Sequence, residues 1–230
     1  MKKIYVTLTA ILLISTRLQA QGFANLNFAG ADIQNGTAAG SLISITNAIP
    51  GWIGYIGTSQ QTSVLYNSLY TGTSVLAILG TNSPVSGNIP GNNYTIVLQA
   101  GSGGDLSETA SIAQTALIPA SAESIEFTAS FPYGAGWQVA INGQVIPVSE
   151  IGSVNSYYNI YAGNISAFAG NIDQLEFTAL TSSGPSVNLY LDNISFSSNP
   201  VPEPRVFRLV TLASLFLMWR CRQKFHQTKA

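Results

Sequence analysis

Short apolar segments alternate with polar turns along residues 22–198, and this pattern predicts β-strands. In the segment SIEFTASF, the apolar Ile125 and Phe127 alternate with polar residues, so the two kinds of side chain face opposite sides of a strand. The stretch 107–120 comes nearest to a helical pattern, but its β-branched residues and Pro119 disfavour a stable helix. The clearest predicted strands are 23–28, 41–46, 62–70, 74–79, 94–100, 124–131, 137–146, 156–163, 174–180 and 186–196.

Two local features refine the strand pattern. Asn142-Gly143 lies between two strand-like runs and predicts a tight hairpin, because both residues adopt positive φ readily. In the final predicted strand the apolar positions change parity between Leu191 and Ile194. A β-bulge or bend at Asp192-Asn193 would restore a common face, so one is predicted there.

The spacing of these segments predicts an all-β fold. About ten short strands separated by turn residues are typical of a two-sheet β-sandwich, here jelly-roll-like, over residues 21–198. The predicted domain is flanked by an N-terminal signal peptide and a C-terminal hydrophobic helix. These flanking segments are addressing signals rather than parts of the sandwich.

Residues 1–20 have the three parts of a secretory signal peptide. Lys2 and Lys3 form its basic start, an apolar stretch follows from Ile4 to Ile14, and Ala20 supplies a small residue at the cleavage position. The sequence therefore predicts export across a membrane.

The C-terminal tail, residues 199–230, contains an apolar helical run at 206–219 and a basic end at 220–230. A run of this length spans about 21 Å as a helix, whereas a bilayer core is about 30 Å thick. Arg208 interrupts the run and is expected to reach toward the membrane interface. The tail therefore predicts a membrane contact that is temporary rather than permanent.

Charge is segregated along the chain. All nine Lys and Arg residues lie outside 21–204, and all ten Asp and Glu residues lie within it. The exported body thus carries a side-chain charge of −10, obtained from ten acidic and no basic residues. Because phosphate binding needs basic side chains, nucleic acid is excluded as a partner.

The order of features in the tail resembles the PEP-CTERM sorting signal of Gram-negative bacteria. Pro202, Glu203 and Pro204 match the motif, which occupies 201–204 and is followed by the apolar run and the Arg-rich end. The resemblance implies that an exosortase and the secretion machinery are partners. It further implies membrane anchoring through 206–219 before cleavage, and a final place at the cell surface or in the extracellular matrix.

The body is similar to the sandwich domains that precede such tails in Verrucomicrobia and Planctomycetes relatives. The stretches that carry this similarity are GFANLNF, IPGWIGYIGT, QLEFTAL and LYLDNISFS. The last of them is also similar to carbohydrate-binding jelly rolls. Carbohydrate is the ligand class that this likeness implies.

Missing residue types exclude most enzyme chemistry. The body has no His, Lys or Cys, and the single cysteine is Cys221, so catalytic triads, Schiff-base lysines and zinc sites with His or Cys ligands are excluded. We predict no catalytic residue. A glycan hydrolase that uses carboxylates alone is the surviving enzyme alternative. Its candidate pairs are Asp105 with Glu108, and Glu123 with Glu126.

Only oxygen ligands are available for a metal in the body, which favours calcium over transition metals. Asp32 near the first predicted strand and Asp192 near the predicted bulge would share a site if the terminal strands pair. The more ordinary interpretation is that both are hydrogen-bonded turn residues. No cofactor other than this possible calcium is predicted.

Aromatic side chains are the candidates for stacking on sugar rings, since they combine flat apolar faces with polar edges. The candidates are Trp52, Tyr55, Tyr157 and Tyr158. Trp52 follows a turn and is expected to be the most exposed, whereas neighbouring Tyr157 and Tyr158 should face opposite ways. Together these features predict a non-enzymatic exported protein associated with exopolysaccharide, with a lectin-like module as the alternative.

Overall fold

The computed structural model describes residues 21–34, 37–70, 72–80, 83, 94–102, 108–130, 136–182 and 184–201. The predicted signal peptide at 1–20 and the sorting residues Pro202, Glu203 and Pro204 lie outside these ranges. So do the apolar run and the basic end of the tail. Within the described ranges, no helix has the length and apolar character needed to cross a membrane.

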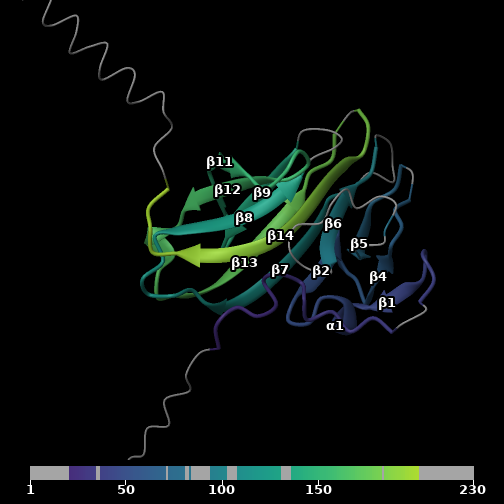
Figure 1. Ribbon diagram of the computed structural model, residues 1–230, viewed down its shortest axis with the longest axis horizontal. Helices are drawn as coiled ribbons and strands as arrows, with labels where there is room; N and C mark the ends of the chain where they lie inside the picture. The colour runs from purple at the N-terminus through teal and green to yellow at the C-terminus, as the bar shows by residue number, and fades with distance from the viewer. Residues whose placement is uncertain are drawn as a thin grey trace, which may run out of the picture.

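The described chain forms two β-sheets that pack face to face (Figure 1). The larger sheet has eight strands in the order β1-β4-β5-β6-β14-β8-β12-β11, and the smaller has six in the order β10-β9-β13-β7-β2-β3. The larger sheet contains β1 (Leu42–Ser44), β4 (Ser63–Tyr66), β5 (Val75–Gly80), β6 (Tyr94–Ala100), β8 (Ser124–Ser130), β11 (Val148–Ser153), β12 (Asn159–Asn164) and β14 (Val187–Ser197). The smaller contains β2 (Ile53–Ile56), β3 (Ser59–Gln60), β7 (Ala110–Leu117), β9 (Trp137–Ile141), β10 (Gln144–Ile146) and β13 (Ile172–Ala179). Two short helical turns, α1 (Ile45–Ala48) and η1 (Ser166–Phe168), complete the secondary structure of the described residues.

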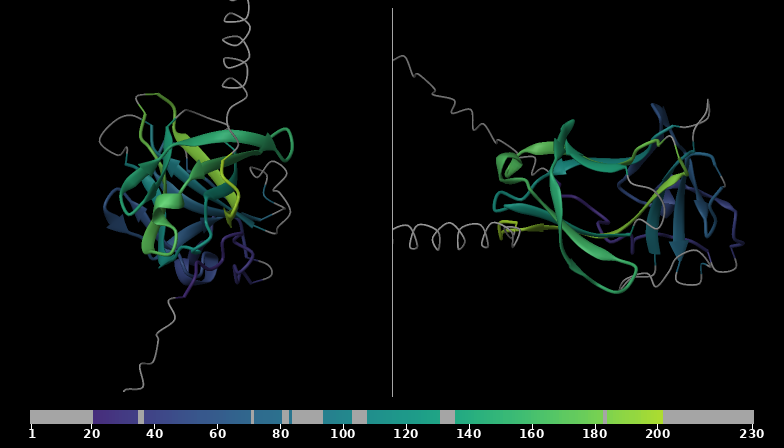
Figure 2. Two further views of the ribbon diagram at one scale, coloured as in Figure 1. Left: turned by 90° about the vertical axis from the view of Figure 1, so that its left-hand side faces the viewer. Right: turned by 90° about the horizontal axis from the view of Figure 1, so that it is seen from above.

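Strand order confirms the predicted two-sheet sandwich. From β6 onward the chain crosses between the sheets, giving β6-β14-β8-β12 in one and β7-β13-β9-β10 in the other. In the larger sheet β14 lies between β6 and β8, and in the smaller sheet β13 lies between β7 and β9. This arrangement is the double Greek-key connection of a jelly roll. The strands before β6 extend the sheets at one edge, and β11 extends the larger sheet at the other (Figure 1). Figure 2 shows the same sandwich from one end and from above.

Aromatic residues from both sheets meet in the space between the layers. Phe127 of β8 packs edge-on against Phe177 of β13, with ring centroids 5.1 Å apart. Trp137 of β9 and Tyr161 of β12 are partly buried and lie 5.9 and 5.8 Å from the Phe127 ring. Burial of such rings between two sheets is the main source of stability in a sandwich.

A second apolar cluster lies on the outer face of the larger sheet. Leu65, Ala77, Leu79, Val97 and Tyr190 are buried there together with Tyr158 from the β11–β12 loop. The middle strands of this sheet are therefore buried on both faces. This explains why SVLAIL and YTIVLQA are almost continuously apolar instead of alternating.

The predicted hairpin and bulge are both confirmed. Asn142 and Gly143 have φ values of 50° and 79° and join β9 to β10 in a two-residue turn. On β14, the register with β8 shifts between Asp192 and Ser195, and Asn193 has a φ of 48°. The bulge returns Ile194 to the core that Leu191 also enters.

Several sequence interpretations differ from the structure: β2, β3 and β11 were not predicted, and the predicted strand 41–46 ends in the helical turn α1. Residues 23–28 do not form the predicted strand, because Asn25 and Phe28 take positive φ values of 51° and 52°. The stretch 107–120, for which no strand was predicted, contains β7. This strand pairs with β13 on one side and β2 on the other, so sheet pairing overrides its weak strand propensity.

The buried phenol of Tyr158 predicts alkaline sensitivity. Burial raises its pKa above the ordinary value, although a hydrogen bond with Thr95 acts in the opposite direction. Above about pH 10 the phenol ionises in the unfolded chain but stays protonated in the folded one. The unfolded state then binds fewer protons, so stability falls as the pH rises through this range. We expect Tyr158→Phe to flatten the decline in urea-unfolding free energy above pH 10, with Tyr157→Phe as the exposed control. Equal slopes in the wild type and Tyr158→Phe would contradict this expectation.

Candidate functional site

Trp52 belongs to the core, and the prediction that it is an exposed stacking residue is wrong. Its side chain is only 4% exposed and lies between the rings of Phe28 and Phe177, at centroid distances of 6.0 and 6.4 Å. Its indole N–H donates to the backbone oxygen of Asn25 at 3.2 Å. The turn at Gly51, whose φ is +90°, leads the chain into the sandwich rather than over its surface.

The adjacent tyrosines face opposite ways, as their alternation predicted. Tyr157 is 56% exposed, whereas Tyr158 is 1% exposed and packs on the outer face of β14 beside Tyr190. Tyr158 is therefore unable to stack on a sugar, and the prediction that it is a stacking residue is wrong. Asn155 shapes this loop, because its side-chain oxygen accepts the backbone N–H groups of both tyrosines at 2.8 and 3.0 Å.

Tyr55 lies in a groove on the outer face of the six-stranded sheet. It is half-buried on β2, and its neighbour in register on β7 is Ser111. On the other side of β7, Glu176 of β13 pairs with Ala113. Two small side chains therefore lie between larger ones, which leaves a hollow of about 220 Å³.

The groove combines an aromatic ring with several hydrogen-bonding groups. Tyr55 and Ser111 supply hydroxyls, Gln174 an amide and Glu176 a carboxylate. The Thr178 hydroxyl donates to Oε1 of Glu176 at 3.4 Å, on the same face of β13. The full lining is Tyr55, Gly57, Thr58, Ser111, Ala113, Gln174 and Glu176.

The sequence identified Tyr55 as a candidate, but not the polar residues that lie beside it in the groove. Gln174 and Glu176 alternate with Leu175 and Phe177, so their outward direction was readable from the sequence. The sequence did not indicate that these two side chains lie close to Tyr55. That depends on β7, which joins β13 to β2 and was not predicted as a strand.

The structure does not bring Tyr157 to this groove. Tyr157 lies in the loop between β11 and β12, at one edge of the larger sheet, whereas β2 lies toward the opposite edge of the sandwich (Figure 1). Of the four predicted stacking residues, Tyr55 lines this groove, and the other three line neither it nor the two further pockets defined by described residues.

The carboxylates proposed for a hydrolase are not found in the pockets described here. Asp105 lies outside the described residues. Glu108 and Glu123 are exposed, Glu126 is half-buried on β8, and none of the three lines the pockets described for this part of the chain. Among the described residues that line the groove, Glu176 is the single carboxylate.

The calcium candidates differ in environment. Asp32 is exposed, and its backbone N–H donates to the Asn47 oxygen at 2.8 Å. Asp192 is fully buried at the bulge, where its Oδ1 accepts the Asn193 N–H at 2.7 Å. Among the described residues, no group of three or more His, Cys, Asp or Glu side chains is placed to hold a metal. Calcium binding therefore stays a prediction.

Comparisons with known proteins place the chain in no family. No family model matches it, and no curated protein matches it. Among solved structures, the enzymatically active domain of tailspike protein 4 from bacteriophage CBA120 has a TM-score of 0.39 at 14% identity. That match covers 75% of this chain, which spans about a fifth (21%) of the tailspike chain.

A second similar structure is the family 11 carbohydrate-binding module from Clostridium thermocellum, solved with a β-1,3-1,4-mixed-linked tetrasaccharide. Its TM-score is 0.35 at 14% identity, with 69% of this chain and 95% of the module covered. Likeness at this level carries no argument about function, so the function must be argued from the groove itself.

Proposed function

We propose that this protein is a non-enzymatic, exported protein of the cell surface or extracellular matrix that binds polysaccharide. The observation that carries the proposal is the groove in which Tyr55 lies beside Ser111, Gln174 and Glu176. An aromatic ring offers a flat apolar face to a sugar, and the surrounding polar groups hydrogen-bond its hydroxyls.

The negative charge of the body indicates which class of polysaccharide it can bind. The body has ten acidic and no basic side chains, so it repels chains that carry uronate, sulfate or phosphate. Glu176 adds a negative charge within the groove itself. A neutral polysaccharide is the ligand that this arrangement favours.

The proposal includes sorting by the C-terminal tail. Its support is the order of Pro202, Glu203 and Pro204, the apolar run and the basic end. The exosortase recognises this tail, the apolar run contacts the membrane before cleavage, and the body is released on the outer side. The absence of basic residues from the body is compatible with residence in an exopolysaccharide matrix.

Tyr55→Ala is expected to weaken polysaccharide binding about tenfold, equivalent to ~1.4 kcal/mol. Affinity electrophoresis in gels containing neutral glucans, or the host's own exopolysaccharide, measures the effect. Tyr157→Ala removes an equally large ring outside the groove and is the matched control. Unchanged retention of Tyr55→Ala in the gel would contradict the assignment of this groove as the binding site. Release of reducing ends from the polysaccharide by the wild type would favour the hydrolase alternative.

A further inference from the structure

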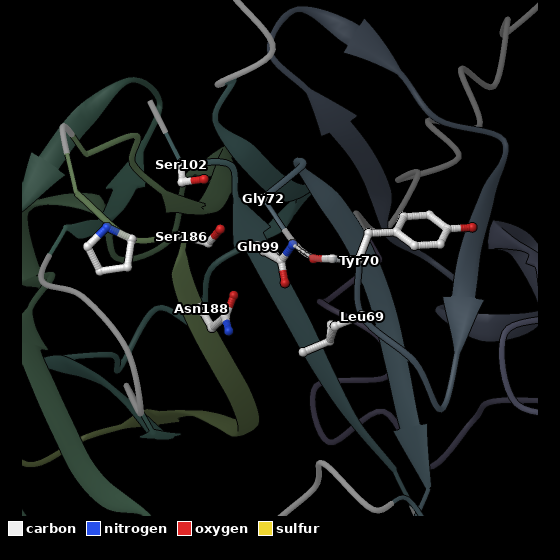
Figure 3. Close-up of a pocket in the computed structure, with 8 residues that line it drawn as sticks. Leu69, Tyr70, Gly72, Gln99, Ser102, Ser186 and Asn188 are labelled. Carbon is white, nitrogen blue, oxygen red and sulfur yellow. Dashed lines mark hydrogen bonds between the residues drawn. The ribbon is translucent and has the colours of Figure 1, made fainter. Parts of the chain in front are cut away.

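A second pocket lies on the outer face of the eight-stranded sheet (Figure 3). Its volume is about 390 Å³, within the range of roughly 300–1,000 Å³ typical of small-ligand sites. One wall comes from β6 and β14 with the turn before β14, and the other from the segment after β4. The lining residues are Leu69, Tyr70, Gly72, Gln99, Ser102, Pro185, Ser186 and Asn188.

The wall after β4 is held firmly against the sheet. The Gln99 side-chain amide donates to the backbone oxygens of Tyr70 and Thr73, both at 2.5 Å. The Ser102 N–H donates to the Gly72 oxygen at 3.2 Å. A Cβ at Gly101 would approach that same oxygen to 2.9 Å, so a glycine is required for the close approach. The pocket is therefore formed before a ligand arrives.

Asn188 supplies an acceptor that the described residues leave unused. Its side chain is 7% exposed, and no donor among those residues reaches its buried Oδ1. Leaving a buried acceptor unsatisfied is unfavourable, so such groups in native structures call for an explanation. In Figure 3 the Asn188 amide lies beside Ser186, among the residues that line the pocket. Rotation of this amide toward the pocket would let a ligand hydroxyl satisfy the acceptor.

The lining restricts the ligand to neutral molecules. None of the described residues that line it is charged, and no basic side chain occurs anywhere in 21–204 to hold an anion. Ser102, Ser186 and the two amides offer hydrogen bonds to hydroxyls, while Leu69 and Pro185 offer apolar contact. The Tyr70 ring points away from Asn188, so ring stacking is not the mode of binding here (Figure 3).

We propose that this pocket binds one or two units of a neutral saccharide, with Asn188 Oδ1 accepting a ligand hydroxyl. The site goes beyond the polysaccharide groove, because it lies on the other sheet and shares no lining residue with it. Two sites on opposite outer faces would let one molecule bridge two glycan chains, which suits a matrix protein.

The test titrates the full exported protein with a panel of neutral mono- and disaccharides and follows it by NMR. Galacturonic acid is the charged comparison. We expect neutral sugars to shift the NMR signals of the Gln99 and Asn188 side-chain amides, and galacturonic acid to shift them much less. Asn188→Leu is expected to weaken binding at least about tenfold while keeping the thermal midpoint, since it removes an unsatisfied acceptor at similar volume. Tyr55→Ala is expected to leave these shifts intact.

Each outcome separates the two sites. Shifts confined to residues around Tyr55 would overturn this inference and leave the proposed function standing. Shifts at Asn188 that survive Tyr55→Ala would support it even if the groove fails. If Asn188→Leu does not fold, Ser186→Ala tests the same pocket at a more exposed residue. If no sugar shifts the NMR signals of this pocket in the wild-type protein, the inference is overturned.

Discussion

Replacing Trp52 with alanine is expected to lower the free energy of unfolding by about 3–5 kcal/mol. The side chain is 4% exposed and packs against Phe28 and Phe177 between the sheets. Its removal leaves a cavity that the rigid sandwich fills only in part. Urea unfolding followed by circular dichroism measures the loss.

Trp52→Phe is the companion variant, because it keeps an aromatic ring but loses the indole N–H bond to Asn25. It should cost less than Trp52→Ala. Tyr157→Ala, at a ring that is 56% exposed, should change stability little. A Trp52→Ala protein of normal stability that fails to bind glycan would contradict the core assignment and restore Trp52 as a binding residue.

Replacing Pro202, Glu203 and Pro204 together with alanine is expected to block maturation of the tail. The wild-type protein recovered from its host should end at or near these residues, whereas the variant should keep 205–230 and stay with the inner membrane. The reason is that the sorting enzyme would no longer recognise its motif, while the apolar run at 206–219 still contacts the bilayer.

Intact mass is the correct measurement of this processing. Trypsin cuts after Arg205 and finds no site within 21–204, so a tryptic digest would imitate the expected mature end. Pro200→Ala is the matched control, since it changes a neighbouring proline outside the motif. Recovery of the wild type with an intact tail in the inner membrane would make the protein tail-anchored and overturn the sorting proposal.

Strands with a clear apolar pattern were predictable from sequence. The segments 94–100, 124–131 and 174–180 became β6, β8 and β13, because inward apolar residues and strand-forming side chains agree there. β7 was missed because five of the eight residues of ASIAQTAL are Ala, Ser or Gln, which favour strands weakly. Its two neighbouring strands impose the extended conformation.

The candidate site was predictable only in part. Tyr55 was identified as an aromatic residue, but the groove also needs Ser111 from β7 and Glu176 from β13. The pocket around Asn188 had no sequence signal, since Gln99 and Asn188 are isolated amides in apolar strands. Long-range pairing brings such residues together, and local patterns do not report it.

The sequence by itself determined the all-β character, the Asn142-Gly143 turn, the bulge after Asp192 and the separation of charge along the chain. These depend on local backbone preferences, side-chain alternation and composition. The tertiary structure alone decided which aromatic rings are exposed. Alternation shows that Tyr157 and Tyr158 face opposite ways, but which of them is covered depends on how their loop folds over β14.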